Sequence, residues 1–163
     1  MEIRADSGEV ELRAYREGDA LAMFTLDRVC FEQRFRFSLH TMRDFAEAPG
    51  AVSVVAEADG AVVGFCIAEV EGEVVYLVTI DVDPEWRRGG LAQSMVGWIA
   101  ARAWDKGARR VDLHVFVENE AAIRFYERLG FGLVGTVPGF YGHGSDALYY
   151  SRRMGFGGLV RPI

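Results

Sequence analysis

Apolar and polar residues follow two different periods along this chain, and the changes between them predict its elements. Three β-rich runs, Val52–Ala56, Val62–Val70 and Val74–Val82, are separated by the pairs Asp59-Gly60 and Glu71-Gly72. Such pairs between apolar runs are typical of hairpin turns, so we expect an antiparallel meander. Because Val74–Val82 is nearly all apolar, it is predicted to be a central strand buried on both faces.

Helical spacing of apolar residues predicts four helices, three of which begin at a residue with a capping side chain, namely Asp19, Ser38 and Asn119. The predicted helices cover 19–30, 38–48, 91–107 and 119–130, and four further strands are expected at 12–15, 111–117, 132–136 and 147–154. The order β-α-α-β-β-β-α-β-α-β-β indicates a mixed α/β fold. Its sheet is expected to be mostly antiparallel, with six to seven strands and about four flanking helices.

Length and composition predict one domain over residues 1–163, with 155–163 as a flexible tail. The net charge of −6 disfavours a nucleic-acid surface, which needs a concentrated basic face. The N-terminal stretch mixes acidic and basic residues and so has no apolar core of a signal peptide, and no apolar run approaches membrane-spanning length. Since Cys30 and Cys66 lie in apolar segments, reduced thiols and a cytoplasmic location are expected, with no membrane partner. The assembly is expected to be a monomer or a homodimer.

A glycine-rich turn lies between the strand that ends at Val82 and the helix that begins near Leu91. It reads Arg87, Arg88, Gly89, Gly90, Leu91, Ala92. Unpaired N–H groups and the dipole at a helix N-terminus suit a phosphate or pyrophosphate. The spacing differs from the two commoner phosphate-loop patterns. On these six residues alone, an ordinary strand-to-helix turn explains the sequence equally well.

Two downstream segments narrow the interpretation. Residues 119–131 read NEAAIRFYERLGF and residues 139–147 read GFYGHGSDA. Together with the glycine turn and the element order, they resemble the GNAT superfamily of acyl-CoA N-acyltransferases over nearly the whole chain. Within it they are most similar to the protein N-terminal acetyltransferases, including the bacterial ribosomal-protein alanine N-acetyltransferases.

The resemblance implies acetyl-CoA as co-substrate and no metal. Arg87, Gly90 and Ala92 match the family's pyrophosphate motif, whose turn includes Arg88, Gly89 and Leu91. The backbone of Ile80, Asp81 and Val82 is expected to pair with the pantetheine arm and to present an N–H to the thioester carbonyl. Asn119 is expected to contact the coenzyme besides capping its helix. The three histidines and two cysteines show no metal-ligand spacing.

The resemblance gives Tyr126 the role of general acid toward the departing thiolate, whereas its residue pattern alone indicates a packed aromatic. His114 stands where the similar enzymes usually carry a glutamate base. A neutral imidazole can accept a proton at pH 7, although a half-buried structural histidine explains the position as well. Phe31, within the aromatic segment 31–37, and Tyr141 are expected to line the acceptor site; simple packing accounts equally for that segment.

These residues predict direct acetyl transfer to a primary amine in a ternary complex, with a peptide N-terminus as the expected acceptor. Two alternatives stay open. Phe140 and Ser145 depart from the family pattern and, with His114, allow a small amine such as a polyamine, amino acid or aminoglycoside. A non-catalytic acyl-CoA sensor is the alternative outside enzymes.

Overall fold

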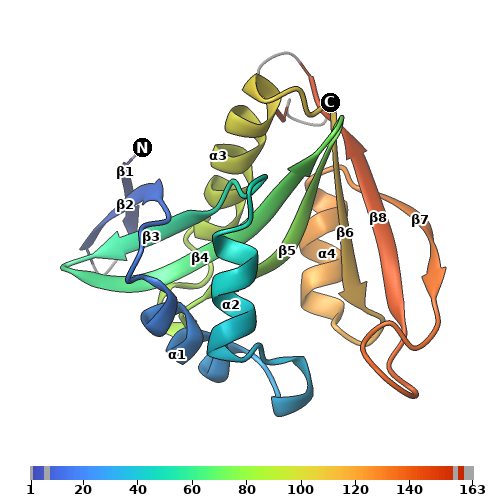
Figure 1. Cartoon of the computed structure of the whole chain (residues 1–163), viewed down its shortest axis with the longest axis horizontal. Coiled ribbons are helices and arrows are strands. Elements are labelled where there is room, and N and C mark those ends of the chain that lie inside the picture. The colour runs from blue at the N-terminus through green and yellow to red at the C-terminus, as the bar shows by residue number, and fades with distance from the viewer. Residues whose placement is uncertain (1, 6–7, 156–157, 160–163) are drawn as a thin grey trace.

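The computed structural model describes residues 2–5, 8–155 and 158–159 and contains one mixed sheet (Figure 1). Its eight strands lie in the order β1-β2-β3-β4-β5-β6-β8-β7. Neighbouring strands are antiparallel except β5 and β6, which are parallel. The strands are β1 (Glu2–Ala5), β2 (Gly8–Ala14), β3 (Val54–Ala58), β4 (Ala61–Glu71), β5 (Val74–Val82), β6 (Arg110–Phe116), β7 (Gly132–Val137) and β8 (Ala147–Arg153).

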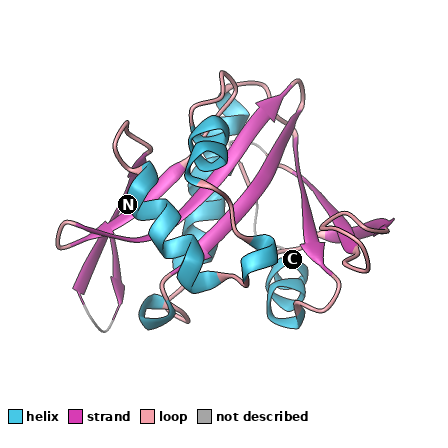
Figure 2. Cartoon of the chain, turned by 60° about the horizontal axis from the view of Figure 1, so that its bottom comes forward, coloured by secondary structure: helices cyan, strands magenta, loops and turns pink. Residues whose placement is uncertain are grey.

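Four α-helices cover the two faces of the sheet (Figures 1 and 2). They are α1 (Ala20–Cys30), α2 (Leu39–Ala46), α3 (Leu91–Asp105) and α4 (Glu120–Arg128), with short 3-10 turns at Gln33–Phe35 and Pro84–Trp86. Met23 and Met42 bring α1 and α2 onto Phe65 of β4 in one buried cluster. Residues of α3 and α4 pack with strand residues in the larger cluster, on the face of the sheet opposite α1 and α2. The core therefore has two halves, one on each side of the sheet.

The structure confirms the predicted fold class and adds β1 to the seven strands predicted. Both hairpin turns form, with φ of 78° at Gly60 and 60° at Gly72. Ser38 and Asn119 cap their helices by accepting from the third residue along, Thr41 and Ala122. Asp19 stands at the N-cap of α1 but makes no capping bond, because its carboxylate binds the Arg13 guanidinium and the Arg16 N–H instead.

The expectation that β5 is buried on both faces is wrong. Val75 and Leu77 are buried, whereas Val78, Thr79 and Ile80 are partly exposed. The reason lies in the pairing of the strand. The register with β4 shifts at Val78, since Leu77 pairs with Ala68 and Thr79 pairs with Ile67. The parallel pairing with β6 also ends at Leu77 and Leu113.

Beyond Leu77 and Leu113, therefore, β5 and β6 separate. The register shift at Val78 is a β-bulge, and bulges bend a strand and increase its local twist. The edge of β5 that faces β6 has no ladder partner over residues 78–82 within the described chain. The opening between the two strands is therefore a place where the fold leaves strand backbone unpaired.

Most of the predicted tail, at 156–157 and 160–163, lies outside the described residues. Leu159 packs against the core cluster on the α3 side. Gly158 lies so close to α3 that an added Cβ would come within 3.2 Å of the Ala101 backbone nitrogen.

Candidate active site

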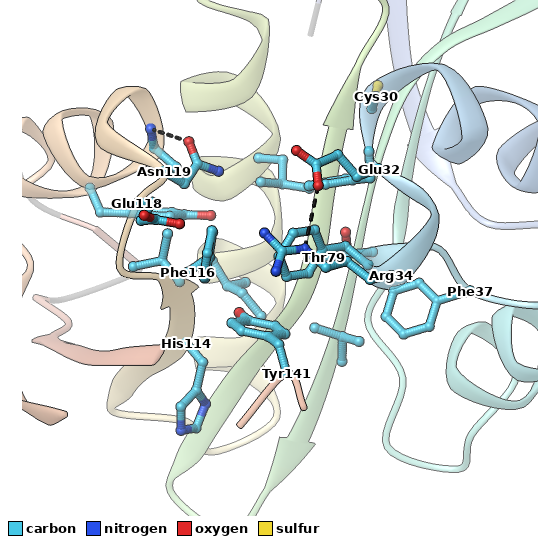
Figure 3. Close-up of a pocket in the computed structure, with 18 residues that line it drawn as sticks. Cys30, Glu32, Arg34, Phe37, Thr79, His114, Phe116, Glu118, Asn119 and Tyr141 are labelled. Carbon is cyan, nitrogen blue, oxygen red and sulfur yellow. Dashed lines mark hydrogen bonds and ion pairs between the residues drawn. The ribbon is translucent and has the colours of Figure 1, made fainter. Parts of the chain in front are cut away.

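A pocket of about 430 Å³ occupies the opening between β5 and β6 (Figure 3). One wall is the backbone and side chains of residues 77–80, and the other is His114, Val115 and Phe116. The segment that follows α1 closes one side, and the start of α4 closes the other. Six of the residues predicted from the sequence line this pocket together: Phe31, Ile80, His114, Asn119, Tyr126 and Tyr141.

The turn before α3 lies outside the pocket, beyond the end of β5. Gly90 holds the N-cap of α3 with φ of 81°, a conformation that glycine adopts readily, and no side chain caps this helix. The first N–H groups of α3 therefore have no protein acceptor within the described chain. Arg88 has φ of 69°, and residues 87–90 are exposed. An uncapped helix beside two arginines fits a diphosphate.

Arg87 connects this turn to the strand, because its Nε donates to the Val82 carbonyl at 3.1 Å. The Cys30 thiol donates to the same carbonyl at 3.3 Å. Asp81, one of the residues predicted to bind the cofactor, does not line the pocket, and its side chain is buried toward α1. Any contact that Asp81 makes with a ligand would therefore come from its backbone.

Tyr126 lies on α4 and reaches the pocket from the α3 side of the sheet. Its side chain is 6% exposed and packs edge-on against Phe125 and Phe131, with ring centroids 5.2 and 5.6 Å away. Burial raises the pKa of its phenol well above the usual range. The group is therefore a neutral hydroxyl, which can donate a hydrogen bond or a proton.

His114 lies on β6 at the rim of the pocket, where Figure 3 shows its imidazole pointing away from Asn119. The Tyr76 hydroxyl is 2.6 Å from His114 Nδ1, and the Phe140 ring stacks on the imidazole with centroids 4.0 Å apart. Burial lowers the pKa of His114, and the charge of Asp112 opposes this shift. Asp112 itself accepts from Tyr149, Ser151 and Arg110. The imidazole is therefore neutral at pH 7.

The segment after α1 forms the aromatic side of the pocket. The Phe35 ring lies 5.0 Å from that of Phe116 and 5.2 Å from that of Tyr141. Arg34 crosses the opening: its guanidinium lies over the Phe116 ring at 4.9 Å, and its Nη1 donates to the Ser145 hydroxyl at 2.9 Å. Figure 3 shows Arg34, Phe116 and Tyr141 gathered in the middle of the pocket. Burial raises the pKa of Tyr141 to about 12.

Tyr76 and Glu118 also belong to this site, although no role was predicted for them from the sequence. Tyr76 is paired with Asp112 in the parallel register, which brings its hydroxyl to His114 two residues along β6. That register is a tertiary property with no local signal. Glu118 is an exposed carboxylate on the pocket lining, directly before the cap Asn119. Its position next to the recognised helix motif was a signal that could have been used.

Both cysteines are free, as expected. Burial raises the pKa of Cys30 to about 11 and that of Cys66 further. A thiol is nucleophilic as its thiolate, so neither is activated at neutral pH. Among the described residues, no three His, Cys, Asp or Glu side chains are placed to hold a metal ion. Within the same residues no helix has the length and apolar character needed to span a membrane.

The chain matches the acetyltransferase (GNAT) family over residues 20–131. It is 30% identical over 151 residues to N-alpha-acetyltransferase daf-31 of Caenorhabditis elegans, covering 88% of this chain and 82% of that protein. The ribosomal-protein-S18-alanine N-acetyltransferase from Escherichia coli has a similar structure, with a TM-score of 0.80 and 21% identity over 94% of this chain and 99% of that chain. Arabidopsis thaliana NAA60 in complex with acetyl-CoA superposes with a TM-score of 0.78 and 23% identity, over 88% of this chain and 98% of that chain. The chain therefore belongs to the acetyltransferase (GNAT) family and is an acetyl-CoA-dependent N-acetyltransferase.

Proposed function

We propose that this enzyme acetylates the α-amine of a peptide or protein N-terminus by direct transfer in a ternary complex. The observation that carries the proposal is the opening between β5 and β6, which places Tyr126 and His114 on one pocket beside unpaired strand backbone. The similarity to N-alpha-acetyltransferases favours an N-terminal amine over other amines.

The donor side of the proposal uses the backbone. We assign the pyrophosphate of acetyl-CoA to the uncapped N-terminus of α3, flanked by Arg87 and Arg88. The free edge of β5 over residues 78–82 is the surface along which the pantetheine arm would extend. An N–H from this edge would stabilise negative charge on the thioester oxygen. Acetyl-CoA supplies the activated acyl group, and the protein aligns it with the amine.

The proton transfers are assigned to two neutral groups. His114 accepts a proton from the acceptor amine through Nε2, which requires Nδ1–H to donate to the Tyr76 oxygen. Tyr126 donates a hydrogen bond or a proton to the departing thiolate. Neither cysteine is activated, so we assign no acyl-enzyme intermediate on a thiol. The acetyl group passes directly from the thioester to the aligned amine.

The acceptor is assigned to the aromatic side of the pocket, built by Phe31, Phe35 and Tyr141. Tyrosine and phenylalanine rings offer an apolar face and, in tyrosine, a polar group at one end. Such a surface suits the first side chain of a peptide together with the polar backbone that follows it. The exposed carboxylate of Glu118 on the lining would attract the positive charge of a free amine, whereas that of Glu32 is paired with Arg34 at 3.3 Å.

The test is release of free thiol from acetyl-CoA in the presence of matched acceptors. Peptides that differ in their first residue are compared with the same peptides blocked at the N-terminus, and with polyamines, amino acids and aminoglycosides. Turnover on free but not on blocked peptides is the expected result. Turnover on small amines alone would contradict the peptide assignment, and acetyl-CoA binding without turnover on any acceptor would favour the sensor alternative.

A further inference from the structure

Two buried carboxyl groups connect α1 to β5 outside the pocket. Asp27 on α1 is 0% exposed and Asp81 on β5 is 1% exposed. Asp27 Oδ2 accepts from the Phe37 N–H at 2.9 Å, and Asp81 Oδ1 accepts from the Thr79 hydroxyl at 2.9 Å. The remaining oxygens, Asp27 Oδ1 and Asp81 Oδ2, are buried with no donor from any other described residue.

These two oxygens satisfy one another if one carboxyl group carries a proton. Ionised carboxylates only accept hydrogen bonds, and two like charges in a buried site strongly disfavour double ionisation. Burial raises the pKa of Asp81 well above its usual range, and the adjacent carboxyl group of Asp27 raises the pKa further. A proton on Asp81 Oδ2 therefore supplies the donor that Asp27 Oδ1 lacks.

The neighbouring titratable groups leave this proton in place at neutral pH. Cys30 from α1, Cys66 from β4 and Tyr126 from α4 all lie within electrostatic range of Asp81. Burial raises the pKa of all three, so they are uncharged. Arg87 is a positive charge that lowers the pKa of Asp81, but burial and Asp27 outweigh it.

The Asp27 side chain also holds the far end of the segment 31–37, because its carboxylate accepts from the Phe37 N–H. The near end continues directly from α1, whose last backbone bond runs from the Phe31 N–H to the Asp27 carbonyl at 3.0 Å. This segment contributes Phe31, Phe35 and Phe37 to the pocket, and β5 contributes residues 77–80. The carboxyl pair thus joins the aromatic wall to the strand at a point just behind the pocket.

We propose that Asp81, as the acid, donates a hydrogen bond to the Asp27 carboxylate, and that the pair acts as two positioning residues that fix the segment 31–37 against β5. The consequence for acceptor binding rests on the proposed function, which assigns the acceptor to that segment. The shared proton itself can be tested without any activity.

Infrared spectroscopy of the full-length protein tests the proton. At pH 7 the wild type is expected to show the carbonyl band of a buried carboxylic acid, and Asp81→Asn is expected to lose it. Asp105→Asn, which removes an exposed carboxylate at the end of α3, is the matched control and should keep the band. A wild-type spectrum without the band, or a band that persists in Asp81→Asn, would overturn the proposal.

Kinetics test the positioning role. Asp81→Ala is expected to raise KM for the acceptor about tenfold, the loss typical of one buried group left unsatisfied, and to raise KM for acetyl-CoA by less, since only the backbone of Asp81 lies on the free edge of β5. Asp81→Asn should restore most of the acceptor affinity, because its amide supplies a permanent donor to Asp27. Equal loss of acceptor affinity in both variants would refute the shared-proton bond.

If the alanine variant fails to fold, the asparagine variant and the infrared band still test the proposal. If the enzyme turns over no acceptor, the proposed function is wrong, but the infrared spectrum still tests the proton shared by Asp27 and Asp81.

Discussion

At the scale of single residues, burial sets which groups can exchange protons in this site. It raises the pKa of Tyr126 and of both cysteines and lowers that of His114, so all four groups are neutral at pH 7. A neutral phenol is a donor and a neutral imidazole is an acceptor, which is the pairing that amine acetylation needs. The same burial removes the thiolates that an acyl relay would need.

Tyr126→Phe removes the donor hydroxyl and keeps the ring that packs against Phe125 and Phe131. We expect kcat to fall about 100-fold, the usual contribution of one general acid, with KM for acetyl-CoA nearly unchanged. Steady-state thiol release gives both constants, and the thermal midpoint serves as the folding control. A drop of less than about twofold in kcat would assign Tyr126 to packing alone.

His114→Ala should lower kcat/KM for a peptide acceptor about 100-fold, because the base is lost. Burial lowers the pKa of His114, so its imidazole stays neutral until the pH falls below the ordinary histidine pKa of ~6.5. The part of the wild-type rate that depends on this base should be lost only below that pH. That acid limb should vanish in His114→Ala, while a limb from the acceptor amine near pH ~8 stays. His114→Glu, which restores a base, is the matched variant and should recover part of the rate. A pH profile identical in wild type and His114→Ala would remove the base assignment.

At the scale of elements, the N-terminus of α3 depends on a backbone conformation more than on a side chain. An added Cβ at Gly90 meets no atom within 4 Å, so a substitution there would not clash with the protein. It would instead strain the backbone, whose φ is 81°, and occupy space that a ligand could use. Gly90→Val is expected to raise KM for acetyl-CoA about tenfold and to cost roughly 1 to 2 kcal/mol of stability. Gly107→Val, at the other end of α3 with φ of 101°, carries a similar backbone cost away from the site. Equal KM values in the two variants would show that the turn does not hold the diphosphate.

Elements were predictable wherever a local pattern determines them. Val74–Val82 has the predicted bounds, and the capping bonds of Ser38 and Asn119 form as expected, because strand patterning and caps act over a few residues. The opening in the sheet was not predictable, since it arises from a register shift at Val78 and from the end of pairing with β6. The same nonlocal register brings Tyr76 to His114, which explains why the candidate site lacked that residue.

At the scale of the whole molecule, one ion-pair cluster joins the first helix to the sheet. Arg13 on β2 binds both Asp19 carboxylate oxygens, at 2.8 and 2.9 Å, and its Nε binds Glu57 on β3 at 2.9 Å. The Arg13 and Asp19 side chains are each 11% exposed, so water screens the pair only partly. A two-pronged pair of this kind contributes more than an exposed ion pair.

Asp19→Asn should therefore lower the free energy of unfolding at pH 7 by about 1 to 2 kcal/mol, measured by urea denaturation. The Arg13 hydrogen bond lowers the pKa of Asp19 below its ordinary value of 3.8. A lowered pKa means that this stabilisation is present above pH 3.8 and is lost as the pH falls through the value in the folded state. The difference between wild type and Asp19→Asn should thus shrink on acidification, whereas the exposed-site control Asp105→Asn should differ little from wild type at pH 7. A difference that stays constant down to pH ~2 would show that Asp19 acts through packing instead of charge.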